Sequence, residues 1–257
     1  MKIEEVTFQN NRGARLDGRI HHPDGPSRGG VVFCHGLFSS KDAYKIVNLS
    51  GEITAAGFTL LAFDFSFVSA MPGSFRDFSI YQEVCDLESA ASFLLERGVS
   101  SLHLAGSSMG GVVALLFAAS RPAFLRSLTL IATPVDLSNL LATLSGSVDF
   151  KNLPKGGTTT IDGIPIHNEF FHEALSLDMQ EAMRSVSVPV LVIHGARDAV
   201  VDVQNAHLLE DSLVAENRVI LVPDGDHNLT RKEDIRLLRS AIIPWISTHE
   251  KNAGRDR

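Results

Sequence analysis

Cysteine is scarce in this 257-residue sequence, which contains only Cys34 and Cys85. Two cysteines do not make a disulfide framework, and neither lies near a second Cys or His at the spacing of a zinc finger. We therefore expect both side chains to be small buried groups. No other cluster of metal-ligating residues stands out along the chain, so the sequence indicates neither a metal nor a cofactor.

Positively charged residues are also few. The chain has 23 lysines and arginines but 30 aspartates and glutamates, which gives a formal net charge of −7. No basic block interrupts this balance, which argues against a nucleic acid or an anionic membrane as partner. No apolar run reaches the length of about 18 residues that a membrane-spanning helix requires. We expect a small molecule as partner, and a monomer or a homodimer.

The start of the chain lacks the apolar core of a secretory signal peptide. Residues 1–6 read Met-Lys-Ile-Glu-Glu-Val, so charged side chains stand where a signal peptide needs apolar ones. We therefore expect a cytoplasmic protein.

Short apolar runs rich in Val, Ile, Leu and Phe recur along the chain, and helical patterns separate them. Two short strands are expected within residues 1–22, around a polar turn at 10–13, and further runs lie at 31–33, 58–63, 102–105, 128–131, 190–193 and 219–222. Runs of this kind fit parallel strands buried on both faces. Helices are expected at 81–97, at 109–120 and from Thr230, as an N-cap with Glu233 three residues later, toward Trp245. The alternation predicts an α/β fold with a mostly parallel sheet flanked by helices on both faces.

One segment, residues 134–189, breaks this alternation. It contains an amphipathic stretch at 137–144, a β-hairpin signal at 158–166 with Asp162-Gly163 at its centre, and a helical pattern at 169–185. We interpret it as a cap, or lid, inserted into a core formed by residues 1–133 and 190–257. The alternative interpretation is a surface elaboration without a role in function.

A candidate nucleophile lies between an apolar strand and a buried helix, in Gly106-Ser107-Ser108-Met109-Gly110. A Gly-x-Ser-x-Gly sequence at such a junction is typical of a sharp turn that holds its central serine in a strained conformation. The helix that follows directs its free N–H groups at the chemistry. Ser108 is therefore the predicted nucleophile, and Ser107 is one place off the motif. The competing interpretation is a glycine-rich turn with a surface serine.

A serine hydroxyl needs a base to take its proton and a carboxylate to orient that base. His227 is the favoured base because it follows the apolar run 219–222, and Asp198 is the favoured acid because it follows the run 190–193. Asp64 is a weaker alternative acid, at the end of an earlier strand. Asp224 and Asp226 are too close in sequence to His227 to be favoured. We expect His35 and His194 to anchor loops.

An acyl-transfer site also needs preorganised N–H donors for the oxyanion of its tetrahedral intermediate. One predicted donor is the backbone N–H of Met109, directly after the serine. The other is expected in the loop after the first central strand, His35-Gly36-Leu37-Phe38, where a glycine permits close approach of the backbone. Leu37 is the preferred donor, with Phe38 as the alternative.

Together these residues resemble the α/β-hydrolase superfamily, from about residue 30 to 245. His35-Gly36, the Ser108 motif, Asp198 and His227 follow in the order of that family. The hairpin in the insert is similar to the cap of the small carboxylesterases of the cinnamoyl/feruloyl-esterase-like group. Two features differ from that group, namely residues 65–74, where many relatives continue Arg-Gly-x-Gly-x-Ser, and Met109, where Gln is common.

The resemblance implies a serine carboxylesterase that hydrolyses small to medium acyl or hydroxycinnamoyl-type esters through an acyl-enzyme. The same residues are compatible with a thioesterase, an amidase or peptidase. A hydrolase-fold binding protein without catalysis is an alternative of a different class.

Overall fold

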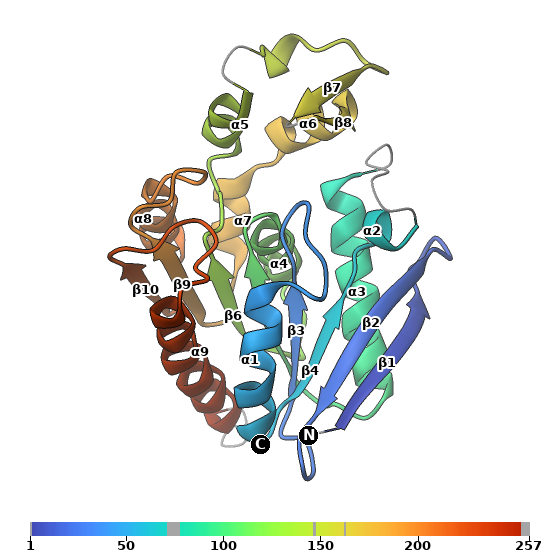
Figure 1. The fold of residues 1–257 in the computed structure, drawn as a ribbon, viewed down its shortest axis with the longest axis vertical. Coiled ribbons are helices and arrows are strands. Elements are labelled where there is room, and N and C mark those ends of the chain that lie inside the picture. The colour runs from blue at the N-terminus through green and yellow to red at the C-terminus, as the bar shows by residue number, and fades with distance from the viewer. Residues whose placement is uncertain (1, 71–77, 146–147, 162, 253–257) are drawn as a thin grey trace.

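Eight strands form one sheet at the centre of the protein in its computed structural model, which describes residues 2–70, 78–145, 148–161 and 163–252 (Figure 1). The order across the sheet is β1-β2-β4-β3-β5-β6-β9-β10. The strands are β1 (Lys2–Gln9), β2 (Arg15–His22), β3 (Gly30–Cys34), β4 (Thr59–Phe63), β5 (Leu102–Ser107), β6 (Leu125–Ile131), β9 (Val190–Gly195) and β10 (Asn217–Val222). β1 and β2 pair antiparallel and β2 is antiparallel to β4, whereas the other neighbours are parallel. The predicted mostly parallel sheet is confirmed.

Helices cover both faces of this sheet. The helices outside the insert are α1 (Tyr44–Ala55), α2 (Ser66–Ala70), α3 (Ile80–Glu96), α4 (Met109–Ala119), α8 (Gln204–Ser212) and α9 (Lys232–Asn252). Successive residues of a strand point to opposite faces, so a central strand needs apolar residues at every position. In β3, Val31 and Phe33 pack on the side of α1 and α9, while Val32 and Cys34 pack on the side of α3 and α4.

The segment between β6 and β9 carries smaller elements. They are α5 (Leu137–Ser145), a 3₁₀ turn (Phe150–Asn152), β7 (Thr158–Ile161), β8 (Ile164–His167), α6 (Asn168–Ser176) and α7 (Met179–Ser185). β7 and β8 form the predicted antiparallel hairpin, with Gly163 at a φ of 80°, whereas Asp162 lies outside the described residues. Figure 1 shows α5, the hairpin and α6 beyond the carboxyl ends of the parallel strands.

A carboxylate holds α6 against the main body. Glu173 accepts hydrogen bonds from the Ser79 hydroxyl at 2.9 Å and from the N–H groups of Ile80 and Tyr81 at 3.0 and 2.8 Å. These N–H groups belong to the first turn of α3 and have no partner within that helix. The insert is thus tied to the core by an acid at a helix N-terminus, where negative charge is favourable.

Two helix predictions need correction. The pattern at 169–185 is two helices, because Leu177 is extended and the Asp178 side chain accepts the N–H of Glu181 to begin α7. α7 packs against α4 and α8. The last helix begins at Lys232, where Asp234 accepts the N–H of Arg231 in place of the expected Thr230–Glu233 pair.

The last helix is longer than expected. It continues past Trp245 to residue 252, with Pro244 inside it. Cys34 is buried as predicted, but Cys85 is only half-buried, since it lies at the edge of the face that α3 turns to the core. No helix among the described residues has the length and apolar character needed to cross a bilayer.

Candidate active site

Ser108 lies at the turn between β5 and α4, with φ 54° and ψ −123°. This conformation is rare for a residue with a side chain and costs about 1–3 kcal/mol. The turn is tight, because a Cβ atom on Gly106 would overlap the backbone of Gly110, and one on Gly110 would overlap the carbonyl oxygens of Cys34 and His35. The two glycines of the motif are therefore required by backbone packing, and they hold the serine at the tip.

The structure brings Ser108, His227 and Asp198 together from three separate connections. Nε2 of His227 lies 3.1 Å from the Ser108 hydroxyl, and Nδ1 of His227 lies 2.8 Å from Oδ2 of Asp198. Asp198 is in the turn after β9 and His227 in the loop after β10. The arrangement lets Nδ1–H donate to the carboxylate and leaves Nε2 to accept the serine proton.

The side chain of Asp198 is completely buried, and several donors hold it. Its Oδ1 accepts the N–H groups of Val200 and Val201 at 2.9 and 2.8 Å, and its Oδ2 lies 3.3 Å from Nε2 of His194. Burial by itself raises the pKa of Asp198, but the hydrogen bonds from His194, His227 and Val201 outweigh it and hold the pKa well below the usual value. The carboxylate is therefore charged across the neutral range.

Asp224 and Asp226, the two other carboxylates near His227 in the sequence, bind other partners. Asp224 forms an ion pair with Arg197 at 2.8 Å, and Asp226 accepts the N–H of Leu229. Among the described residues, no group of three or more His, Cys, Asp and Glu side chains is placed to hold a metal ion.

His35 is a loop anchor, as expected from its position. Its Nδ1 donates to the carbonyl of Gly36 at 2.8 Å, and its Nε2 accepts the N–H of Phe65 at 3.3 Å. Burial lowers the pKa of His35, which favours the neutral ring that this donor–acceptor pattern needs. The ring thus connects the loop after β3 to the end of β4.

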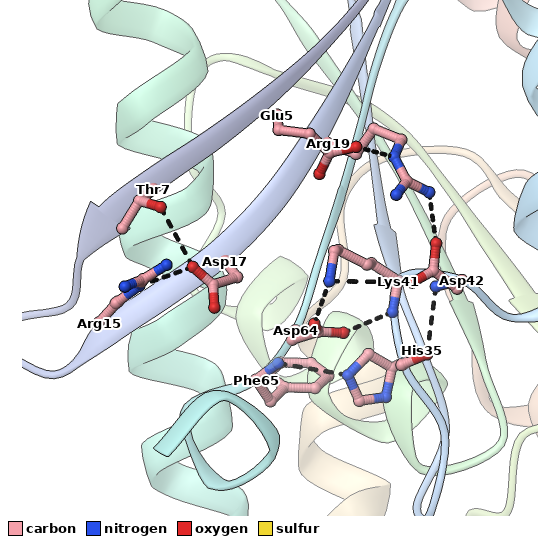
Figure 2. A network of polar contacts seen from close by, with 11 residues as sticks. Glu5, Thr7, Arg15, Asp17, Arg19, His35, Lys41, Asp42, Asp64 and Phe65 are labelled. Carbon is pink, nitrogen blue, oxygen red and sulfur yellow. Dashed lines mark hydrogen bonds and ion pairs between the residues drawn. The ribbon is translucent and has the colours of Figure 1, made fainter. Parts of the chain in front are cut away.

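Asp64 also holds this loop, through Lys41. It accepts both the ammonium and the backbone N–H of Lys41 at 2.6 Å (Figure 2). Burial lowers the pKa of Lys41, but the contacts with Asp64 raise it above the usual value. Arg19 of β2 pairs with Asp42 beside it. The sequence analysis did not identify Lys41. Asp64, the acidic residue at the end of β4, was the signal that could have indicated a basic partner here.

Two cavities of about 230 Å³ each adjoin Ser108, and Leu37, Ser108 and His227 line both. The first lies beneath the insert and is mostly apolar. Its apolar lining includes Leu140, Leu141, Ile161, Ile166, Phe170 and Phe171. The second is lined by apolar groups such as Phe33, Leu37 and Ala43 and by polar side chains from the loop after β3, α1 and the His227 loop. The polar side chains include Ser39, Tyr44, Lys45, Asn228 and Thr230.

Lys45 was not singled out by the sequence, and no motif surrounds it. Its ammonium donates to the carbonyl of Asn228, the neighbour of His227, at 2.8 Å. Burial lowers the pKa of Lys45 to about 8, although the charges of Asp226 and Asp198 act in the opposite direction.

The model of the alpha/beta hydrolase family matches residues 31–234. The chain belongs to this family. That assignment confirms the resemblance drawn from the Ser108 motif and agrees with the parallel sheet and its flanking helices.

The individual proteins that the chain resembles have low sequence identity to it. The mitochondrial palmitoyl-protein thioesterase ABHD10 of Mus musculus is 27% identical over 226 residues, which cover 84% of this chain and 75% of that protein. Est1E of Butyrivibrio proteoclasticus, solved with ferulic acid, has a TM-score of 0.85 at 17% identity, covering 95% of this chain and 98% of that one. An esterase domain from Rhodothermus marinus has a TM-score of 0.74 at 25% identity, covering 97% and 100%.

Proposed function

We propose that this alpha/beta hydrolase is a serine carboxylesterase. The observation that carries the proposal is the continuous hydrogen-bonded series from the Ser108 hydroxyl through the His227 ring to the buried Asp198 carboxylate. A strained serine at a helix N-terminus, with a base and a carboxylate that orients the base, is the arrangement that nucleophilic acyl transfer requires.

In the proposed mechanism, Nε2 of His227 takes the proton of Ser108 as the hydroxyl oxygen attacks the ester carbonyl. Asp198 stabilises the imidazolium that forms. His227 then gives the proton to the leaving oxygen, and an acyl-enzyme remains on Ser108. Water, activated by His227 in the same way, attacks this intermediate and releases the carboxylic acid.

The oxyanion is proposed to bind to the backbone N–H groups of Leu37 and Met109. Both residues line the apolar cavity together with Ser108. Within the described part of the chain, neither N–H donates a backbone hydrogen bond. The hydrogen bonds of His35 and Lys41 hold the loop that carries Leu37, which supports a preorganised donor.

The acyl group is proposed to occupy the apolar cavity beneath the insert, so that residues 134–189 supply a cap and 1–133 with 190–257 the core. Its Leu, Ile and Phe lining fits small to medium acyl chains or a hydroxycinnamoyl ring. The ferulic acid bound to Est1E supports an aromatic acyl group. The similarity to a palmitoyl-protein thioesterase supports a second candidate, thioester hydrolysis at the same site. We further propose a small-molecule substrate, a monomeric or homodimeric state and a cytoplasmic location.

Labelling with a fluorophosphonate tests the nucleophile. The native protein and Ser107→Ala are expected to be labelled, whereas Ser108→Ala is expected to show no labelling. A native protein that stays unlabelled and hydrolyses no ester would contradict catalysis and favour the binding protein.

A substrate panel then separates the candidate activities. It contains p-nitrophenyl esters of two to twelve carbons, methyl ferulate, the matched acyl thioesters and aminoacyl anilides. An esterase is expected to have its highest kcat/KM on the oxygen esters. A higher kcat/KM on the thioesters would favour the second candidate.

A further inference from the structure

The two cavities at Ser108 differ in chemistry, although they have the same volume and meet at the same serine. An ester carbonyl at Ser108 carries two substituents, the acyl chain and the leaving group. If the acyl chain fills the apolar cavity, the leaving group extends into the cavity that Ser39, Tyr44 and Lys45 line. In that arrangement the side chains of this second cavity contact the leaving group.

Lys45 is the only lysine or arginine among the described residues that line either cavity. An ammonium carries three donors, and the carbonyl of Asn228 accepts one of them. No Asp or Glu appears in the lining of either cavity within the described residues. The two carboxylates that act on Lys45 electrostatically have other partners, since Asp198 is bound to His227 and Asp226 accepts a backbone N–H. A cation with donors besides the one bound to Asn228 thus lines the same cavity as the reacting serine.

We propose that Lys45 selects substrates whose leaving group carries a carboxylate, so that the preferred esters join an apolar acyl chain to a hydroxy acid. This inference rests on the proposed function. Hydrolysis breaks the bond between the acyl carbon and the leaving oxygen, and His227 delivers the proton to that oxygen. The hydroxy acid leaves first, and water then releases the acyl group as a carboxylic acid.

An ammonium and a carboxylate in a partly buried cavity form a charge-assisted hydrogen bond, which is about twice as strong as a neutral one. Removal of such a contact lowers binding by about tenfold or more. Without Lys45 the cavity has no lysine or arginine charge that would favour a carboxylate over an amide of the same shape.

The test compares the decanoyl ester of glycolic acid with the decanoyl ester of glycolamide, which has the same shape without the charge. The kcat/KM ratio of the charged to the neutral ester is measured for the native protein and for Lys45→Met, Lys45→Arg and Lys2→Met. Met keeps an unbranched side chain and removes the charge, Arg keeps the charge, and Lys2 is an exposed lysine on β1, at the edge of the sheet. Comparing this ratio between variants cancels the intrinsic reactivities of the two leaving groups.

We expect Lys45→Met to lower the ratio about tenfold, Lys45→Arg to retain most of it and Lys2→Met to leave it unchanged. An unchanged ratio in a folded Lys45→Met protein that hydrolyses both esters would overturn this inference and leave the proposed function intact. The inference would also be overturned if Lys45→Met instead impairs the hydrolysis of monodecyl succinate, in which the acyl part carries the charge, more than that of the glycolic ester. A native protein that hydrolyses none of these esters would overturn both the inference and the proposed function.

Discussion

The imidazole of His194 and the carboxylate of Asp198 are both completely buried, and Nε2 of the histidine lies 3.3 Å from Oδ2 of the aspartate. The same Nε2 lies 2.9 Å from the carbonyl oxygen of Val201. The single Nε2–H of His194 is thus directed at both the carbonyl of Val201 in the turn and the Asp198 carboxylate. His227 contacts the same Oδ2. His194 therefore acts as a positioning residue for the proposed acid, which fits the loop-anchoring role expected from the sequence.

Replacement of His194 by Phe removes this donor and is expected to lower kcat about tenfold with little change in KM. The reason is that Asp198 loses one of the hydrogen bonds that keep its pKa low and its orientation constant. Steady-state kinetics on a p-nitrophenyl ester measures the effect. His194→Gln retains a donor and is expected to recover part of kcat, whereas equal losses in both variants would point to a packing role only.

The apolar cavity predicts a chain-length effect. Ile161 is 5% exposed and lines the cavity, whereas Ile164, its partner across the hairpin, is half-buried and does not line it. Ile161→Ala is expected to lower kcat/KM for a decanoyl ester about tenfold relative to a butanoyl ester, because each buried methylene contributes about 0.8 kcal/mol. Ile164→Ala is the matched control. An equal loss of kcat/KM on both esters would show that the insert does not select the acyl chain.

The preference for a carboxylate leaving group is expected to depend on pH. Burial lowers the pKa of Lys45 to about 8, so the ammonium is present below this pH and lost above it. The kcat/KM ratio of the glycolic to the glycolamide ester should therefore fall between pH 7 and pH 9. Any pH dependence of the chemical step that the two esters share cancels in the ratio. In Lys45→Arg the ratio should stay constant, because a guanidinium remains charged in this range.

A buried acid on α3 predicts a pH dependence of stability. Burial, with the nearby charges of Asp86 and Glu173, holds the pKa of Glu83 well above its usual value. The folded protein therefore keeps a proton that the unfolded chain releases, and stability falls as the pH rises from the unfolded toward the folded pKa, by up to about 1.4 kcal/mol per pH unit.

Glu83→Gln removes this titration, so the variant should gain stability over the native protein as the pH increases from 5 to 8. Urea unfolding at several pH values measures the difference in free energy of unfolding. Glu88→Gln, on the exposed side of the same helix, is the matched control. A constant difference between Glu83→Gln and the native protein would contradict a raised pKa.

Much of the candidate site could be predicted because its members follow buried strands. Ser108, Asp198 and His227 come after β5, β9 and β10, and parallel strands present their carboxyl ends at one edge of the sheet. Local patterns suffice for such residues, since apolar runs mark the strands. The two glycines of the serine motif add a steric signal that the tight turn explains.

Other contacts could not be predicted because they join residues with no periodic relationship. Lys45 meets the carbonyl of Asn228 across 183 positions, and Asp64, an alternative acid by its position, is instead held by Lys41. The predicted single helix at 169–185 was wrong for a related reason. Its apolar pattern continues through Leu177, but the capping carboxylate of Asp178 begins a new helix.

The sequence by itself determined the α/β fold, the order of the candidate triad and the turn that presents Ser108, because each of these depends on residues that are neighbours in the chain or on the period of a buried strand. Only the tertiary structure decided which carboxylate meets His227 and where the two cavities lie. The tertiary structure also decided that Lys45 lines one of these cavities. These outcomes depend on distances and burial between remote segments, and electrostatic interactions at those distances leave no periodic signal in the sequence.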